Sequence, residues 1–245
     1  MAPATQGPET QGPASAIGGR SVLEGAFALL EAVERNGEAG PTRLANECGL
    51  PKTTAYRLLE QLADLGAVER SRGSYRVGPR MFRLGRAWQP HPRLRAATRA
   101  PVNRLVKVTG ATVGIAVLSK GETLMVDWQV GETELPIPPH PGMTWPWFTA
   151  AGKTLVAAAD PAAPLLGPLP TAWQRQAAAI RDRGAAFDRE EVVAGVCCAA
   201  VPLIGAGGVP VAALCVVTDP AHHLERLADA ARQTSRMIGA VLRGR

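Results

Sequence analysis

Hydrogen-bond donors and small hydroxyls gather on one side of the segment between residues 52 and 61. They are Lys52, Thr53, Thr54, Tyr56 and Arg57. Side chains of these types bind DNA phosphates and the edges of base pairs. The opposite side is apolar, with Ala55, Leu58, Leu59, Leu62 and Leu65 at the spacing of an amphipathic helix. The segment therefore predicts a helix that packs through its apolar side and contacts DNA with its polar side. We call it the reader helix.

Three arginines follow this reader helix, at Arg70, Arg72 and Arg76. The residues around them alternate between apolar and polar on both sides of a turn at residues 72–74, which predicts a short β-hairpin. A hairpin with a glycine at its tip offers reach but little shape for reading bases. We therefore predict that all three arginines contact phosphates.

Two earlier helices position the reader helix. Residues 42–48 predict a short helix that ends at Gly49, a residue type that accepts the positive φ of a sharp turn, and Pro51 suits the start of the next helix. Ser21 is expected to cap a helix that extends to about Asn36. Its predicted buried side consists of Val22, Ala26, Leu29, Leu30 and Val33. A helical hairpin that serves packing alone is the alternative, but the arginine hairpin behind it favours a DNA-binding winged helix-turn-helix over residues 20–78.

The distribution of charge along the chain supports the prediction of a DNA-binding domain. The 245 residues carry a net charge of +6, and the segment from Arg20 to Ala100 contains 14 basic and 8 acidic residues, so the excess lies there. After Asp64 only Glu69 is acidic up to Ala100. A localised basic field of this kind is typical of proteins that bind a polyanion.

No motif for catalysis or for a metal emerges from the sequence. The four cysteines, Cys48, Cys197, Cys198 and Cys215, form no C-x-x-C pair, and the adjacent two should point to opposite faces of a strand. Gly152-Lys153-Thr154 resembles the end of a P-loop, but Trp147 stands where the loop needs glycine. The four histidines have no partner in a nucleophile motif, and a solvated loop explains the acidic cluster at residues 188–191. We therefore predict no enzyme activity, no catalytic residue, no metal and no cofactor.

The sequence also predicts where the protein resides. Its N-terminus lacks the basic region and apolar run of a signal peptide, and no apolar stretch approaches the roughly 20 residues of a membrane span. The cysteine pattern suits reduced thiols. We expect a soluble, cytoplasmic protein without a membrane partner.

The pattern changes from helix to strand at Ala111. Strands are predicted over residues 111–118, 123–130, 185–188, 197–204 and 209–217, and helices over residues 149–159, 171–183 and 224–242. Successive hairpins imply an antiparallel sheet with helices packed on it, so the fold class is α+β with two domains.

The remaining segments predict a tail and a linker. Residues 1–19, rich in Pro, Gly, Ala, Thr and Gln, should be a disordered tail. Helices are predicted over residues 79–88 and 94–109, and Pro101 predicts a kink or a new helix start. We assign residues 79–100 to a linker whose first helix makes a dimer contact, because a palindromic DNA site requires a dimer.

The assembled motifs resemble the IclR family of bacterial transcriptional regulators over nearly all of the chain after Gly19. The reader part of the resemblance consists of Leu50–Leu59, Gly66, Tyr75–Gly78 and Leu84-Gly85. The effector part consists of Gly142, Thr149–Lys153, Asp188–Glu191, Gly195–Ala200 and Pro202. The resemblance implies a winged-helix domain, a linker helix and, over residues 101–245, a GAF-like effector domain. It also implies homodimers, often paired into tetramers, on double-stranded operator DNA.

The resemblance also implies a site for a small-molecule effector. Carried over by position, its contacts are Ala150, Ala151, Asp188, Cys198, Cys215 and Val217. Trp145 and Trp147 lie in a Pro-rich loop, and we predict that they line or cover the pocket, because exposed tryptophans are unfavourable. Hydroxyl side chains are common in the family at the last two contact positions, and the segment between Ala159 and Trp173 is shortened. Both departures favour an effector less polar than a hydrophilic oxoacid, or a weakened site.

The sequence thus predicts a DNA-binding transcriptional regulator that responds to a small effector, with repression favoured over activation. Two alternatives stay open. In one, the C-terminal domain is degenerate and binds no effector. In the other, the chain is an enzyme with an appended DNA-binding domain, which should turn over a substrate and lose that activity when Asp188 becomes Ala.

Overall fold

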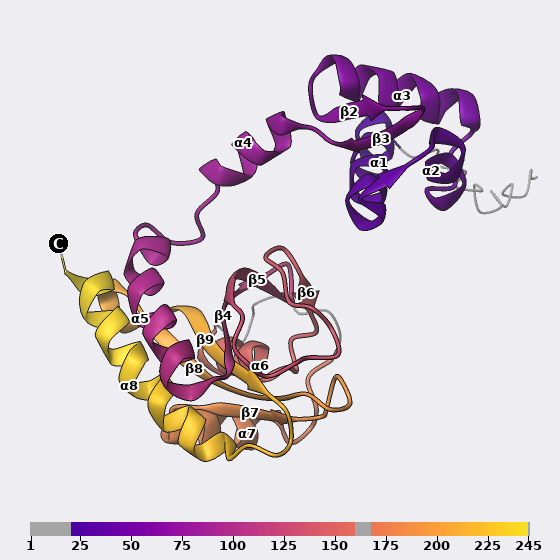
Figure 1. Cartoon of the computed structure of the whole chain (residues 1–245). Helices are drawn as coiled ribbons and strands as arrows, with labels where there is room; N and C mark the ends of the chain where they lie inside the picture. The colour runs from indigo at the N-terminus through magenta and orange to yellow at the C-terminus, as the bar shows by residue number, and fades with distance from the viewer. Residues whose placement is uncertain (1–20, 160–167, 245) are drawn as a thin grey trace, which may run out of the picture. The chain divides into compact units, whose positions relative to one another are not determined.

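The computed structural model describes residues 21–159 and 168–244 (Figure 1). The predicted disordered tail lies outside these residues, and so does most of the shortened segment after Ala159. The chain forms two compact units, one up to Trp88 and the other from Gln89 onward. No helix in the described part of the chain is long and apolar enough to cross a membrane.

The first unit begins with α1 (Val22–Asn36), which starts where the sequence predicts. Ser21 and Glu24 form a reciprocal cap, in which Glu24 N–H donates to Ser21 Oγ at 3.2 Å and Ser21 N–H donates to Glu24 Oε2 at 2.8 Å. The predicted buried side needs one correction. Val22 is 58% exposed, because it lies in the first turn, ahead of the buried residues Gly25, Leu29, Ala32 and Val33.

The helix-turn-helix consists of α2 (Pro41–Glu47) and α3 (Lys52–Asp64). Gly49 adopts a φ of 64° in the turn between them, a conformation that favours glycine. The predicted apolar side of α3 is buried at Ala55, Leu58, Leu59 and Leu62. Leu65 differs from the prediction: it ends the helix and is 57% exposed.

The predicted β-hairpin is present as β2 (Val68–Ser71) and β3 (Ser74–Val77), which pair in antiparallel register. A third strand, β1 (Glu38–Ala39), pairs with β3 and completes a sheet of order β1-β3-β2. This strand was not predicted from the sequence, because two residues carry no alternating pattern. The unit ends with α4 (Pro79–Ala87), in which no residue is buried.

The second unit contains a six-stranded sheet of order β6-β5-β4-β9-β8-β7 (Figure 1). The strands are β4 (Thr112–Ser119), β5 (Glu122–Gln129), β6 (Thr144–Trp145), β7 (Ala186–Arg189), β8 (Cys197–Ile204) and β9 (Pro210–Thr218). Every neighbouring pair is antiparallel, so the predicted α+β class with an antiparallel sheet is confirmed. The short β6 lies within the loop predicted over residues 135–148.

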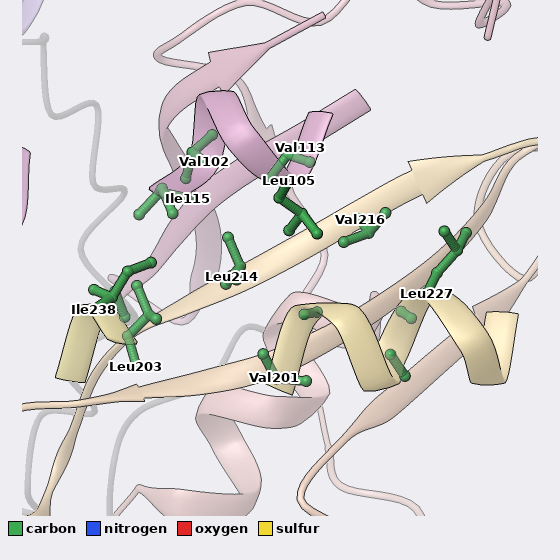
Figure 2. Packing of buried hydrophobic residues seen from close by; sticks show 14 of the residues in the cluster. Val102, Leu105, Val113, Ile115, Val201, Leu203, Leu214, Val216, Leu227 and Ile238 are labelled. Atoms are coloured by element: carbon green, nitrogen blue, oxygen red, sulfur yellow. The ribbon is translucent and has the colours of Figure 1, made fainter. Parts of the chain in front are cut away.

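Two long helices cover one face of this sheet, α5 (Leu94–Thr109) and α8 (Leu224–Arg243). Leu105 of α5 and the α8 residues Leu227 and Ile238 pack with Val113, Ile115, Val201, Leu203, Leu214 and Val216 of the strands (Figure 2). α5 runs through Pro101 as one continuous helix, so a new helix start at Pro101 was the wrong alternative.

The other face of the sheet packs against α6 (Ala150–Ala158), and α7 (Trp173–Arg183) lies next to α6. A short 3₁₀ turn, η1 (Ala206–Gly208), joins β8 to β9. The side chains of Ala151 and Leu155 meet Ala213, Cys215 and other sheet residues in a second apolar cluster. The effector residues expected from the sequence lie around this second face.

Candidate DNA-binding surface and effector cavity

The polar side of α3 is open to solvent. Lys52, Thr53, Tyr56 and Arg57 are exposed, and Thr54 is half-buried. Neither Lys52 nor Arg57 forms an ion pair with any other described residue. Their charges are therefore available to a partner, while the leucines on the opposite side hold the helix on the core of the unit.

The hairpin presents its three arginines differently from one another. Arg70 forms an ion pair with Glu60 of α3, and Arg76 forms one with Glu69 at 2.9 Å. Arg72 occupies the turn at a φ of 44° and has no ion-pair partner among the described residues. All three are exposed, but only Arg72 lacks an ion-pair partner within the described part of the chain, which makes it the strongest of the three candidates for a phosphate contact.

Tyr75 fixes the hairpin to the reader helix. Its hydroxyl donates to Glu60 Oε1 at 2.7 Å, and its side chain is buried. Burial, followed by the hydrogen bond to the Glu60 carboxylate, raises the pKa of Tyr75 to about 12. The hydroxyl therefore remains a donor at neutral pH, and hairpin and helix form one continuous surface.

A cavity lies on the α6 side of the sheet in the second unit. Its volume is about 80 Å³, and one water needs roughly 10–15 Å³, so the space fits a small molecule. Of the predicted effector contacts, its wall includes Trp145, Ala151, Asp188, Cys198, Cys215 and Val217.

Strand register explains why these residues meet. Asp188 on β7 pairs with Cys198 on β8, which pairs with Val217 on β9. Residues directly opposite each other in a sheet share a face. The three side chains therefore point to the same side of the sheet. The next cross-strand row on that side lies two residues further along the strands, and it contains Cys215. Cys197 turns to the other face and joins the α5–α8 core, which confirms that the adjacent cysteines point apart.

Asp188 is the one charged residue in the described wall of the cavity. It is 6% exposed, and its Oδ1 accepts the N–H of Glu191 at 2.9 Å. Burial raises the pKa of Asp188, against the opposing effects of the Glu191 N–H and the positive charge of Lys153. A carboxylate in such surroundings binds a hydrogen-bond donor more readily than an anion.

Lys153 holds the segment beside Asp188 in place. Its side chain is buried, and Nζ donates to the carbonyl oxygen of Phe187 at 3.1 Å and to the carboxylate of Glu191. The ammonium of Lys153 is thus already paired, and the residue does not line the cavity. It ties α6 to the chain that leads into the valine-rich part of the wall at residues 192–196.

Two of the predicted effector residues lie outside the cavity wall. Trp147 is buried against Trp173 of α7, with ring centroids 5.0 Å apart, so it covers the apolar core there and not the pocket. The side chain of Ala150 is fully buried in the second cluster. Thr149 caps α6 by accepting the N–H of Gly152 at 3.2 Å. Helix geometry leaves the N–H groups of Ala150 and Ala151 without an intrahelical acceptor.

The two thiols of the cavity form hydrogen bonds. Cys215 Sγ donates to the carbonyl oxygen of Gly114 at 3.3 Å. A hydrogen bond with Cys215, and then burial, raises the pKa of the Cys198 thiol well above its usual range. Across the described ranges, residues 21–159 and 168–244, no cluster of three or more His, Cys, Asp or Glu side chains could hold a metal ion.

Several residues of the cavity wall were not among the effector contacts predicted from the sequence. They include Met125 and Trp128 on β5, Thr149, and the valines Val192, Val193 and Val196. Met125 and Trp128 are three residues apart, so strict alternation would place them on opposite faces. A bulge at Val126 shifts the register, and both side chains face the cavity opposite Ala116 and Gly114. The valines follow no strand or helix period that would have marked them.

Comparison with known proteins identifies relatives of the chain. The family model of the IclR helix-turn-helix domain matches residues 22–72, and that of the bacterial transcriptional regulator IclR C-terminal region matches residues 170–240. The HTH-type transcriptional regulator Rv1719 of Mycobacterium tuberculosis is 30% identical over 77% of this chain and 78% of its own. The transcriptional repressor IclR of Escherichia coli is 29% identical, over 83% and 81%.

The fold also matches solved structures. A crystal structure of an IclR homolog from Microbacterium hydrocarbonoxydans, complexed with 4-hydroxybenzoate, superposes with a TM-score of 0.80. The match covers 91% of this chain and 99% of that one at 23% sequence identity, so it bears on the fold alone. The predicted arrangement of a helix-turn-helix unit and an α+β sheet unit is confirmed.

Proposed function

The chain belongs to the IclR family of bacterial transcriptional regulators, and we propose that it represses transcription as a homodimer on a palindromic operator, from which a small-molecule effector releases it. It is a transcriptional regulator with a helix-turn-helix DNA-binding domain and an effector-binding C-terminal domain.

The exposed polar side of α3 next to the arginine hairpin carries the proposal. Lys52 and Arg57 are free of ion pairs in the described structure, and Arg72 stands beside them in the same unit on a hairpin that Tyr75 anchors. We assign base reading to α3, through Arg57 with Lys52, Thr53, Thr54 and Tyr56. We assign phosphate contacts to Arg70, Arg72 and Arg76.

We propose a homodimer because a reader helix of this type contacts one half-site, and two half-sites about one helical turn apart require two copies. α4 is the proposed contact, within a linker over residues 79–100 that separates a DNA-binding domain (20–78) from an effector domain (101–245). Its apolar side chains support this role, since Phe82 is 67% and Leu84 is 58% exposed in the single chain. A dimer of dimers would extend the same arrangement.

The direction of regulation rests on relatives. The Escherichia coli relative is named as a transcriptional repressor, which supports repression here. The effector assignment rests on the cavity, with Asp188, Cys198, Cys215, Val217, Ala151 and Trp145 in its wall. An intact cavity favours an effector-binding domain over a degenerate one. The named relatives are regulators, which supports a cytoplasmic, non-catalytic role.

A transcription assay tests this function. Genomic fragments retained by the purified chain would be sequenced, and the enriched promoter fused to a reporter in a strain that lacks the gene. Reintroducing the gene should lower reporter output, whereas Arg57→Ala should not. Arg104→Ala removes an exposed arginine from α5 in the other unit and is the matched control. Equal or increased output with the wild-type chain would refute repression.

A further inference from the structure

The effector cavity contains a second polar group that faces an almost entirely apolar wall. Trp128 of β5 lines the cavity, and its indole Nε1–H is buried without a hydrogen-bond partner among the residues that the structure describes. Buried donors are nearly always paired in native proteins, so an orphan donor in a ligand cavity points to an acceptor that arrives with the ligand. Asp188 is the complementary acceptor, because its Oδ2 receives no hydrogen bond from the described residues.

The indole is held in place by the sheet. A bulge at Val126 turns Trp128 to the cavity face, and the backbone N–H of Trp128 donates to Asp127 Oδ1 at 2.9 Å. The ring lies against Gly114, where an added Cβ would stand 2.9 Å from Cε3 and from Cζ3. A side chain at this position would therefore displace the indole ring. A ring fixed in this way loses little entropy when it binds a ligand.

Trp128 and Asp188 line the cavity from β5 and β7, two strands that are not neighbours in the sheet. β5 and β7 are separated by β4, β9 and β8, which makes four strand intervals. At about 4.8 Å an interval, the backbones are roughly 19 Å apart along the sheet, and the side chains and the curl of the sheet shorten that span. A ligand that reaches both groups is elongated, with its acceptor and its donor at opposite ends.

The charge of the cavity disfavours one class of ligand. Asp188 is the one charged side chain in the described wall, and the ammonium of Lys153 is occupied by Glu191 and the Phe187 carbonyl. Thr149 is uncharged, and Cys215 donates its S–H to the carbonyl oxygen of Gly114. A carboxylate ligand would bring a negative charge close to Asp188, and the described wall offers it no cation, only the N–H groups at the start of α6, which makes such a ligand unfavourable.

We infer that the effector is an uncharged, elongated molecule that donates a hydrogen bond to Asp188 at one end and accepts one from the Trp128 indole at the other. This inference rests on the proposed function, because it assigns the ligand class of the same effector site. Phenolic ketones, amides and esters have this chemistry, whereas organic acids do not. Trp128 thus acts as a specificity-determining residue.

Three probes with a common ring separate the two contacts. 4-Hydroxyacetophenone has a phenol donor and a ketone acceptor, 4-hydroxybenzoate replaces the acceptor with a carboxylate, and 4-ethylphenol lacks an acceptor. Calorimetric titration of the full chain at neutral pH should show the ketone binding about tenfold or more tighter than the carboxylate. It should also bind about threefold to tenfold tighter than 4-ethylphenol.

Variants assign each difference to a residue. Trp128→Phe keeps an aromatic ring but removes the N–H, so it should lower the affinity for the ketone more than that for 4-ethylphenol and abolish the advantage of the ketone. Asp188→Asn should shrink the advantage of the ketone over the carboxylate. Equal or tighter carboxylate binding by the wild-type chain, an unchanged ketone preference in Trp128→Phe, or no binding of the ketone at millimolar concentration would overturn the inference. Retention of operator DNA, measured on the same preparation, reports the proposed function separately: a chain that binds DNA but prefers the carboxylate keeps its function and refutes only the ligand class.

Discussion

Arg57 is the side chain on α3 whose removal reports base reading most directly, because it is exposed and free of ion pairs in the described structure. Arg57→Ala should weaken binding to the preferred operator by about 1–3 kcal/mol and relax the preference at one base pair. Fluorescence anisotropy on operators with single base-pair changes measures both effects. Arg104→Ala, the same substitution in the other unit, should alter neither. Unchanged affinity and preference in a folded Arg57→Ala chain would remove Arg57 from the contacts.

Asp188 makes the stability of the effector unit depend on pH. Its folded-state pKa is raised by burial, so the folded chain holds the proton to higher pH than the unfolded chain does. The stability from the protonated form is fully present below the ordinary aspartate pKa and is lost as pH rises through the folded value. Asp188→Asn does not titrate, so its stability relative to wild type should increase from acid to neutral pH.

Denaturant unfolding at a series of pH values measures that difference. Asp182→Asn, at an exposed position on α7, is the matched control and should show no such trend. A relative stability of Asp188→Asn that falls as pH rises would mean that the carboxylate is stabilised when charged, contrary to the burial argument.

At the residue scale, prediction from the sequence succeeded where side chains follow the regular spacing of a helix or strand. The polar side of α3 follows from helical spacing, and the resemblance placed Asp188 and Cys198 on the cavity side of two paired strands. Trp128 was unpredictable, because a bulge at Val126 reverses which face it meets. Trp147 was misassigned, because a loop sequence does not show that its ring packs against Trp173.

The hairpin β2–β3 should contribute charge and little sequence preference. Arg70 and Arg76 are held in exposed ion pairs, which typically contribute about 0–1 kcal/mol and can be exchanged for a phosphate. Arg72 has no ion pair with a described residue that must break before it contacts a phosphate. Arg72→Ala should therefore weaken binding to all sequences alike and reduce the salt slope of log K by about 0.9.

Anisotropy titrations on operator and random DNA over a range of salt concentrations measure that slope. Lys107→Ala, which removes an exposed charge from α5, should leave it unchanged. A loss of affinity for the operator alone would show that Arg72 reads bases.

The start of α6 depends on a glycine. A Cβ on Gly152 would lie 2.2 Å from the carbonyl oxygen of Trp147 and 2.4 Å from Thr123 Oγ1, and neither atom belongs to a flexible side-chain end. Gly152→Ala should destabilise the second unit by about 1–3 kcal/mol. Thermal unfolding measures the loss, with Gly85→Ala as control, since a Cβ there meets nothing within 4 Å. An unshifted transition for Gly152→Ala would show that the helix start yields without strain.

At the element scale, helices and long strands were predictable, because capping residues, turn glycines and alternation act locally. Ser21 and Glu24 cap α1, and Gly121 with a φ of 83° closes the hairpin between β4 and β5. The two-residue strands β1 and β6 were missed, since they exist through pairing with β3 and β5 and not through a pattern of their own. The continuity of α5 through Pro101 is likewise set by packing against the sheet and α8.

At the scale of the whole molecule, reading and sensing lie in separate units. The net charge of +6 arises between Arg20 and Ala100, while the cavity lies within the unit that begins at Gln89. An effector can change operator affinity only if it binds the DNA-bound and the released arrangements of the dimer with different affinity. The uncharged ligand class inferred for the cavity would act through that difference.

A DNase I footprint on the enriched genomic fragment tests the central claim, that α3 and the β2–β3 hairpin bind a specific operator. We expect a protected palindrome whose half-sites are centred about 10–10.5 base pairs apart, or a multiple of that spacing. Protection should be lost with Arg57→Ala and retained with Arg104→Ala. Uniform protection without a boundary, or a footprint that survives Arg57→Ala unchanged, would contradict it.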